Sequence, residues 1–126
     1  DLRMLRIFKE KGFHTFASIE PVVDFSSSYA MVNRTVRFCD QFLIGLMSKP
    51  GTELSPYSKE ACSLFVYKTD KLVSGRKGRG NPRIYWKESV RKLMESDDDA
   101  MQILRYSPVS VGRDWSLFTG KDTGEL

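Results

Sequence analysis

The sequence has few of the residues that most often carry catalysis or bind metals. It contains one histidine, His14, and two cysteines, Cys39 and Cys62, among 126 residues. A single histidine excludes a zinc site built from several histidines, and two distant cysteines form neither a metal-binding spacing nor a disulfide framework. We therefore expect no metal site. Unpaired cysteines are typical of a reducing compartment, so we expect a cytoplasmic protein with both cysteines buried as small side chains.

Long hydrophobic runs are also absent. No apolar segment approaches the roughly 20 residues of a membrane-spanning helix, so we expect no membrane partner. The hydrophobic share of 40% and the net charge of +4 are typical of one globular domain. The chain begins at Asp1 rather than at a methionine, and we expect it to be the carboxyl-terminal portion of a longer protein.

Helical and strand-like patterns alternate along the chain. Strands are predicted over 14–23, 41–47 and 83–86, because these segments are rich in aromatic and β-branched residues. Segments with helical spacing precede, separate and follow them. This alternation predicts an α/β fold in which repeated β-α units form a small parallel sheet flanked by helices.

Smaller expectations concern caps and burial. Gly12 and Gly75 follow helical segments and are predicted to end them, whereas Ser58 is predicted to cap a long helix. Ser26 or Ser27 is predicted to cap the helix after the first strand. The apolar run 16–19 predicts a strand that is covered on both faces.

Polar residues stand at the ends of the predicted strands. Pro21 lacks a backbone N–H, so regular pairing of the first strand should stop near Glu20. Ser18 and Glu20 alternate and therefore face the same side. Lys49 follows the second strand, and Lys87 follows the third. Because binding groups collect at the carboxyl ends of parallel strands, these four residues are the candidate cofactor-binding or substrate-binding residues.

Each candidate also has a structural alternative. Glu20 could accept hydrogen bonds from a nucleoside-like ligand, or it could pair with a lysine, since a charged residue in an apolar run needs a partner. Lys87 could be that lysine, and we favour this structural pairing for it. Lys49 is expected to be solvated. Gly45 lies inside an apolar strand, where glycine often marks the close approach of another group.

A resemblance to a known family rests on four segments: GFHTFASIEPVVDF, RTVRFCD, QFLIGLMS and RIYWKESVRKLM. They resemble the last strands and helices of the barrel in radical S-adenosylmethionine (radical SAM) proteins related to the spore photoproduct lyase group. The resemblance covers about residues 1–96 and implies a partial TIM barrel that lines a cofactor and substrate cavity. The family motif CxxxCxxC, which holds a [4Fe-4S] cluster, is absent here.

The resemblance thus implies a fragment that is inactive alone. S-adenosylmethionine and a [4Fe-4S] cluster would belong to the full-length relative, and this chain would hold no cofactor itself. The expected partner is the missing amino-terminal part of the same protein. Three parallel strands do not close an eight-stranded barrel, so we also expect self-association through exposed sheet edges. The remaining segment, 97–126, is expected to form an irregular tail that packs on residues 1–96.

The rival hypothesis is a binding module for nucleic acid or protein. Its candidate residues are Arg76, Lys77, Arg79 and Arg83, in a loop whose basic, glycine-rich composition suits a phosphate backbone. The loop follows a helix and precedes a strand, however, whereas phosphate-binding glycine loops follow a strand and lead into a helix. A solvated loop is the alternative reading, and nucleic-acid binding is not favoured.

Overall fold

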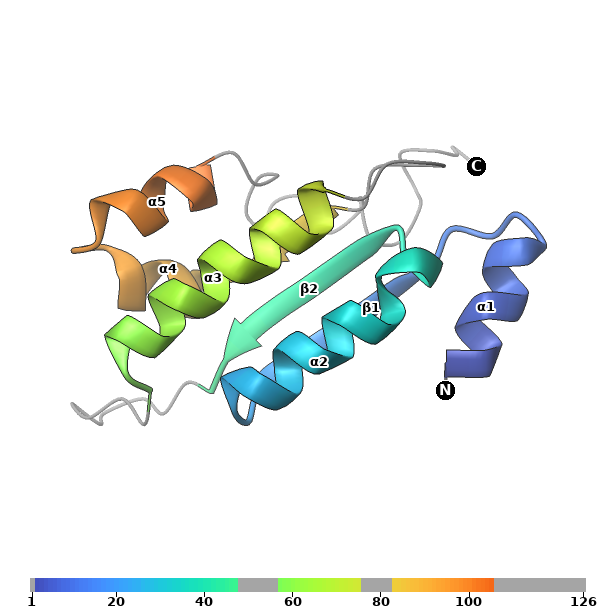
Figure 1. Ribbon diagram of the computed structural model, residues 1–126, viewed down its shortest axis with the longest axis horizontal. Helices are drawn as coiled ribbons and strands as arrows, with labels where there is room; N and C mark the ends of the chain where they lie inside the picture. Colours follow the sequence, from blue (N-terminus) through green and yellow to red (C-terminus); the bar gives the residue numbers. More distant parts are fainter. Residues whose placement is uncertain (1, 48–56, 76–82, 106–126) are drawn as a thin grey trace.

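The computed structural model describes residues 2–47, 57–75 and 83–105. In this part of the chain a three-stranded parallel sheet, in the order β1-β2-β3, is flanked by helices (Figure 1). The elements are α1 (Leu2–Glu10), β1 (Phe16–Val22), α2 (Phe25–Thr35), the short 3-10 helix η1 (Val36–Phe38), β2 (Gln41–Leu46), α3 (Lys59–Ser74), β3 (Arg83–Trp86), α4 (Glu88–Met94) and α5 (Asp98–Arg105). The predicted α/β class and the three strands are confirmed.

One face of the sheet carries the hydrophobic core, and we call it the first face. Ile19, Ile44 and Trp86 lie side by side on it in register, and all three are buried. Helices α2, α3, α4 and α5 all contribute residues to this core. Phe65 of α3 packs edge-on against Trp86, with 5.9 Å between the ring centroids. Burying this continuous apolar layer is the main force that holds the helices on the sheet.

The opposite side of the pleat, the second face, carries a different set of residues. Because side chains alternate along a strand, three rows point to it: Phe16, Gln41 and Arg83; then Ser18, Leu43 and Tyr85; then Glu20, Gly45 and Lys87. Leu43 and Tyr85 are buried, yet neither belongs to the core that the helices form. The two faces are therefore chemically distinct.

Strand β1 differs from its prediction in burial. It alternates between exposed and buried residues, and Phe16 remains 40% exposed, so the expectation of cover on both faces is wrong for this strand. The exposed residues Phe16 and Ser18 lie on the face of the sheet opposite the core that the described helices form. Regular pairing is interrupted after Ile19, as expected near Glu20, but it does not stop there, because Val22 pairs with Leu46 in a shifted register.

The helix ends follow the predicted chemistry with one correction. Ser58 caps α3 by accepting from the Ala61 N–H, and Gly12 adopts a φ of 89° after α1. Helix α2, in contrast, is capped by Asp24, whose carboxylate accepts from the Ser27 N–H at 2.7 Å. The prediction of a Ser26 or Ser27 cap is wrong because α2 begins earlier, at Phe25, so both serines lie inside its first turn and Asp24 is the residue that precedes it.

Helices α1 and α5 lie at opposite ends of the molecule (Figure 1). Helix α5 begins the segment expected as a tail, and its Ala100 and Leu104 are buried in the common core. Residues 106–126 lie outside the described part of the chain. Among the helices that the structure describes, none has the length and apolar character needed to cross a membrane.

Candidate functional site

The carboxyl edge of the second face holds an ion pair that crosses the central strand. Lys87 Nζ donates to Glu20 Oε2 at 2.5 Å, although Glu20 belongs to β1 and Lys87 directly follows β3 on the other side of the sheet. Gly45 of β2 lies between them. A Cβ atom at Gly45 would come within 2.9 Å of Lys87 Cδ and 3.2 Å of Glu20 Oε2. Glycine therefore leaves room for the two long side chains, which meet directly above its backbone.

The ion pair is accessible to solvent. The side chains of Lys87 and Glu20 are 32% and 33% exposed. Ser18, one row below Glu20 on the same face, is also exposed. The predicted common orientation of Ser18 and Glu20 is confirmed, and so is the approach of Lys87 to Glu20. These groups offer a carboxylate, an ammonium group and a hydroxyl to a ligand that approaches this edge.

Two hydroxyl groups fix the strand ends beside the ion pair. The Tyr57 hydroxyl donates to the Val22 carbonyl at 2.6 Å and accepts from the Met47 N–H at 2.8 Å, so it joins the ends of β1 and β2. Ser89 Oγ accepts from the Leu46 N–H at 2.9 Å. Sequence reasoning missed both roles. The only available signal was the position of Ser89 close behind the third strand.

Of the other predicted residues, Arg83 is the one that falls within the described part of the chain. Lys49, Arg76, Lys77 and Arg79 are outside the described residues. Arg83 is described and exposed, and it starts β3 at the amino edge of the sheet, in register with Gln41 rather than with Glu20. The structure therefore brings Ser18, Glu20 and Lys87 together and separates Arg83 from them.

Sequence reasoning also missed a polar cluster around one carboxylate, that of Asp40, at the amino edge of the sheet. Asp40 accepts from the Lys9 ammonium group and, at 2.7 Å, from the Thr15 backbone N–H. His14 Nδ1 lies 3.8 Å from the same carboxylate. Burial acts to raise the pKa of Asp40, but the hydrogen bonds from Lys9 and Thr15 outweigh it and hold the pKa below its ordinary value. Asp40 therefore ties α1 to the starts of β1 and β2.

The two cysteines are buried and free, as predicted. Burial raises the pKa of Cys39 to about 11 and that of Cys62 to about 12. Both are therefore thiols at neutral pH, and a thiol is neither a good nucleophile nor a metal ligand. Within the described residues, no group of three or more His, Cys, Asp or Glu side chains could hold a metal ion.

Comparisons with known proteins yield no relative. No family model, no curated protein and no solved structure matches the chain.

Proposed function

We propose that the chain is the carboxyl-terminal part of a radical SAM-like barrel protein, in which the second face of the sheet lines a cofactor and substrate cavity. The observation that carries the proposal is the position of the Glu20–Lys87 pair, at the carboxyl edge of the strands and opposite the helical layer. In (β/α)₈ barrels the helices cover the outside, and the carboxyl edge carries the active site.

The topology supports this proposal. The strands follow one another in sequence order, and the crossover helices α2 and α3 both pack on the first face. Two crossovers that step in the same direction with helices on the same face have the same hand, as in a barrel. One half of a doubly wound sheet has the same strand order and helix placement, and strands beyond these three would distinguish the two folds. The described strands are therefore compatible with a section of a barrel wall.

The outer edge of β1 suits the expected partner, which is the amino-terminal part of the same protein. A groove of about 730 Å³ runs along this edge, between Leu2 and Leu5 of α1 and Met31 of α2. None of the α1 side chains is buried. A preceding barrel strand placed in this groove would pair with β1 and cover the apolar side of α1. Self-association, which is also expected from the sequence, would use the same edge.

The residues present do not fit a [4Fe-4S] cluster, because the only cysteines, Cys39 and Cys62, are buried thiols. The cluster of the full-length relative would have to be held by residues outside this chain. S-adenosylmethionine is compatible with the site, because the Glu20 carboxylate can accept from amino or hydroxyl groups and Ser18 adds a hydroxyl. We infer that the chain alone has no catalytic activity.

Two measurements test this proposal. First, the coding sequence upstream of Asp1 should contain a CxxxCxxC motif within about 100 to 200 residues, a range set by barrel size. Second, the longer protein should bind S-adenosylmethionine, and Glu20→Gln should weaken that binding about tenfold by removing a charged hydrogen-bond acceptor. Glu88→Gln is the matched control, since Glu88 is exposed on α4 beside Lys87 and takes no part in the pair.

Two outcomes would contradict the proposal. One is an upstream sequence without the motif. The other is a longer protein in which Glu20→Gln and Glu88→Gln have equal effects on binding.

The chain alone, supplied with iron and sulfide under anaerobic conditions, should bind no iron–sulfur cluster. Absorption spectroscopy measures this. An absorption band at about 400 nm from a thiolate-held cluster would show that the two cysteines of the chain are sufficient to bind one.

A further inference from the structure

The second face of the sheet is buried unevenly. Gln41, Leu43 and Tyr85, on β2 and β3, are 3%, 4% and 0% exposed. On the same face of β1, Phe16 is 40% exposed, and Ser18 is exposed as well. Ser18 and Leu43 are partners in the register, so the change from exposed to buried occurs between adjacent strands. A cover therefore lies over the β2–β3 half of this face and not over β1.

The helices that the structure describes do not provide this cover. Helices α2 to α5 contribute to the core on the first face, which includes neither Leu43 nor Tyr85. Helix α1 lies beside the outer edge of β1, where its Leu2 and Leu5 line the groove. Neighbouring strands alone do not enclose a large ring, as the exposure of Phe16 shows. Leu43 and Tyr85 are buried within a single chain, so the cover has to come from residues of that chain outside the described part.

Gln41 adds a polar requirement to this cover. Its side-chain oxygen, Oε1, is buried and has no hydrogen-bond partner among the described residues. Buried polar groups are nearly always hydrogen-bonded, so the covering segment should also supply a donor. A segment that is mainly apolar and carries some hydrogen-bonding groups therefore fits this half of the face.

The segments outside the described residues differ in composition. Segment 48–56, SKPGTELSP, has one large apolar residue, and segment 76–82, RKGRGNP, has none. Segment 106–126 concentrates five of them between positions 109 and 118: Val109, Val111, Trp115, Leu117 and Phe118. Serine alternates with apolar residues in its VSV and WSL stretches, which places the apolar side chains on one side of an extended segment. Segment 106–126 is therefore the one suited to an apolar sheet face.

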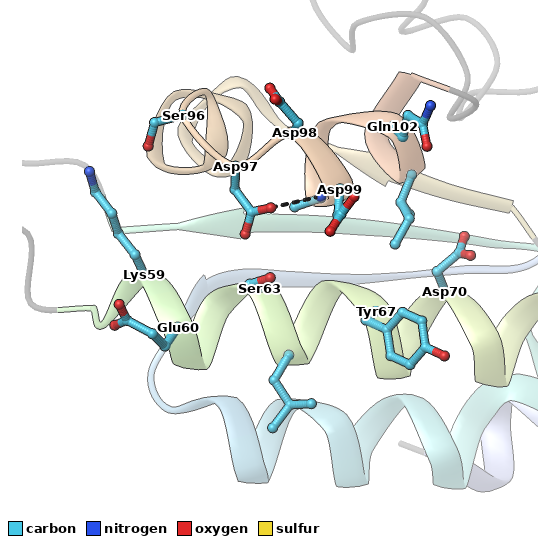
Figure 2. A pocket seen from close by; sticks show the side chains of 13 residues that line it. Lys59, Glu60, Ser63, Tyr67, Asp70, Ser96, Asp97, Asp98, Asp99 and Gln102 are labelled. Carbon is cyan, nitrogen blue, oxygen red and sulfur yellow. Dashed lines mark hydrogen bonds between the residues drawn. The ribbon is translucent and has the colours of Figure 1, made fainter.

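Segment 106–126 can also reach the second face. It continues from α5, and about 20 extended residues span up to about 65 Å, whereas β1 and β3 are only about 10 Å apart. An adjacent surface is the groove between α3 and α5, with a volume of about 1180 Å³. Figure 2 shows the carboxylates of Asp70, Asp97 and Asp99 pointing into the space between these helices. Apolar side chains buried there would remove the carboxylates from water, so the second face is the better match.

We propose that segment 106–126 packs over the β2–β3 half of the second face and leaves the β1 half open. Its apolar side chains enclose Leu43 and Tyr85. This packing is inferred from burial and composition, so it does not rest on the proposed function of the chain. It does bear on the candidate site. Lys87 borders the covered half and Glu20 belongs to the open half, so a ligand of this pair approaches from the side of β1.

The test measures the access of a thiol reagent to two neighbouring positions in the full chain. Leu43→Cys places a thiol on the covered half, and Ser18→Cys places one beside it on the open half. Cys39 and Cys62 belong to the core on the first face, so both should react slowly. Their slow reaction reports that a variant remains folded, and chains without an added cysteine supply the background rate.

Two changes are combined with each added thiol. The segment variant carries Trp115→Ser, Leu117→Ser and Phe118→Ser. The matched control is Leu54→Ser, because it replaces the one large apolar residue of segment 48–56. Circular dichroism compares the secondary structure of both variants with that of the wild-type chain.

We expect Ser18→Cys to react quickly in every background and Leu43→Cys to react slowly in the otherwise unchanged chain. The segment variant should raise the reaction rate at Leu43→Cys about tenfold or more, since the cover opens while the core stays folded. Leu54→Ser should leave that rate unchanged. The protection of Leu43→Cys should not depend on protein concentration, because the cover belongs to the same chain.

Three outcomes would overturn the inference. One is Leu43→Cys reacting as fast as Ser18→Cys in the otherwise unchanged chain, which would mean an open face. Another is protection that persists in the segment variant or is lost equally with Leu54→Ser, which would assign the cover to other residues. The third is protection that disappears on dilution, which would assign the cover to a second copy.

A second measurement decides the question if the segment variant unfolds, as reactive Cys39 and Cys62 would show. Nuclear Overhauser contacts of the Leu43 methyl groups are then recorded in the wild-type chain. Contacts with protons of segment 106–126 would support the inference. Contacts with other segments alone, or none beyond the neighbouring strands, would overturn it.

Discussion

The two ends of the sheet use the same pair of charged groups for different purposes. At the amino edge, Lys9 meets Asp40, and the side chains are 23% and 16% exposed. At the carboxyl edge, Lys87 meets Glu20, and both side chains are about one third exposed. Asp40 also accepts from the Thr15 N–H, whereas Glu20 accepts from the Lys87 side chain. The carboxylate at the amino edge is therefore held by backbone and side chain, while the pair at the carboxyl edge is more exposed to solvent.

This contrast matches a difference between the two edges of (β/α)₈ barrels. In those barrels, residues at the amino edge serve stability, and residues at the carboxyl edge form the binding site. Gly45 belongs to the carboxyl edge, and a side chain at that position would enter the space that the Glu20–Lys87 pair occupies. If the comparison is right, substitutions at the amino edge should change the free energy of unfolding strongly, and substitutions at the carboxyl edge should change it little.

The largest effect is expected for Asp40→Ala. The substitution leaves the buried N–H of Thr15 without its acceptor and removes the partner of Lys9. We expect the free energy of unfolding to fall by about 2 kcal/mol, measured by urea denaturation. Glu95→Ala, an exposed acid at the end of α4, is the control and should change it by less than about 0.5 kcal/mol. If Asp40→Ala and Glu95→Ala lower the free energy of unfolding equally, the contacts of Asp40 at the amino edge do not stabilise the fold.

The pH dependence of stability should report the same cluster. The pKa of Asp40 is lowered in the folded chain, so its ionised form is favoured by folding. This stabilisation is complete above the unfolded value, about 3.9, and is lost as the pH falls through the lower folded value. Asp40→Asn should flatten that part of the stability profile. Some slope should remain, because the pKa values of Asp24 and Asp97 are lowered as well. An unchanged profile would contradict the assignment.

The sequence predicted the carboxyl edge better than the amino edge. Pro21 marks the interruption of regular pairing, alternation places Ser18 and Glu20 on one side, and Gly45 marks a close approach. These are local rules that need only the strand assignment. The Asp40 cluster depends on where α1 and η1 settle in space, because Lys9 and Asp40 are 31 residues apart. No local pattern encodes that meeting, so Asp40 looked only like the end of a helix.

The helix positions were predictable for a similar reason, whereas the exposure of α1 was not. Periodicity and caps such as Ser58 and Gly75 determine where α3 begins and ends. Amphipathic spacing in α1 indicates that an apolar side exists, but it does not tell what covers that side. In the structure, none of its side chains is buried. A local pattern cannot predict which other segment packs against the apolar side of α1.

A smaller effect is expected for Gly45→Ala. The new Cβ would push against the flexible ends of Lys87 and Glu20 and separate the ion pair. Replacing glycine inside a strand also gains about 0.5 to 1 kcal/mol, which offsets the lost contact. We expect the free energy of unfolding to change by less than about 1 kcal/mol, while the nuclear magnetic resonance signal of the Lys87 ammonium group shifts as its partner leaves. A loss comparable to that of Asp40→Ala would make the carboxyl edge structural too.

The smallest effect concerns the coupling between Glu20 and Lys87 themselves. A double-mutant cycle with Glu20→Gln and Lys87→Met isolates that coupling from the rest of each side chain. Because both groups are one third exposed, we expect only about 0.5 kcal/mol, and less still when salt is raised to about 1 M. Weak coupling is what a ligand site requires, since a ligand must compete with the pair for both groups. A coupling free energy above about 2 kcal/mol that does not change with salt would identify a structural ion pair. It would remove the main support for a binding site at this edge.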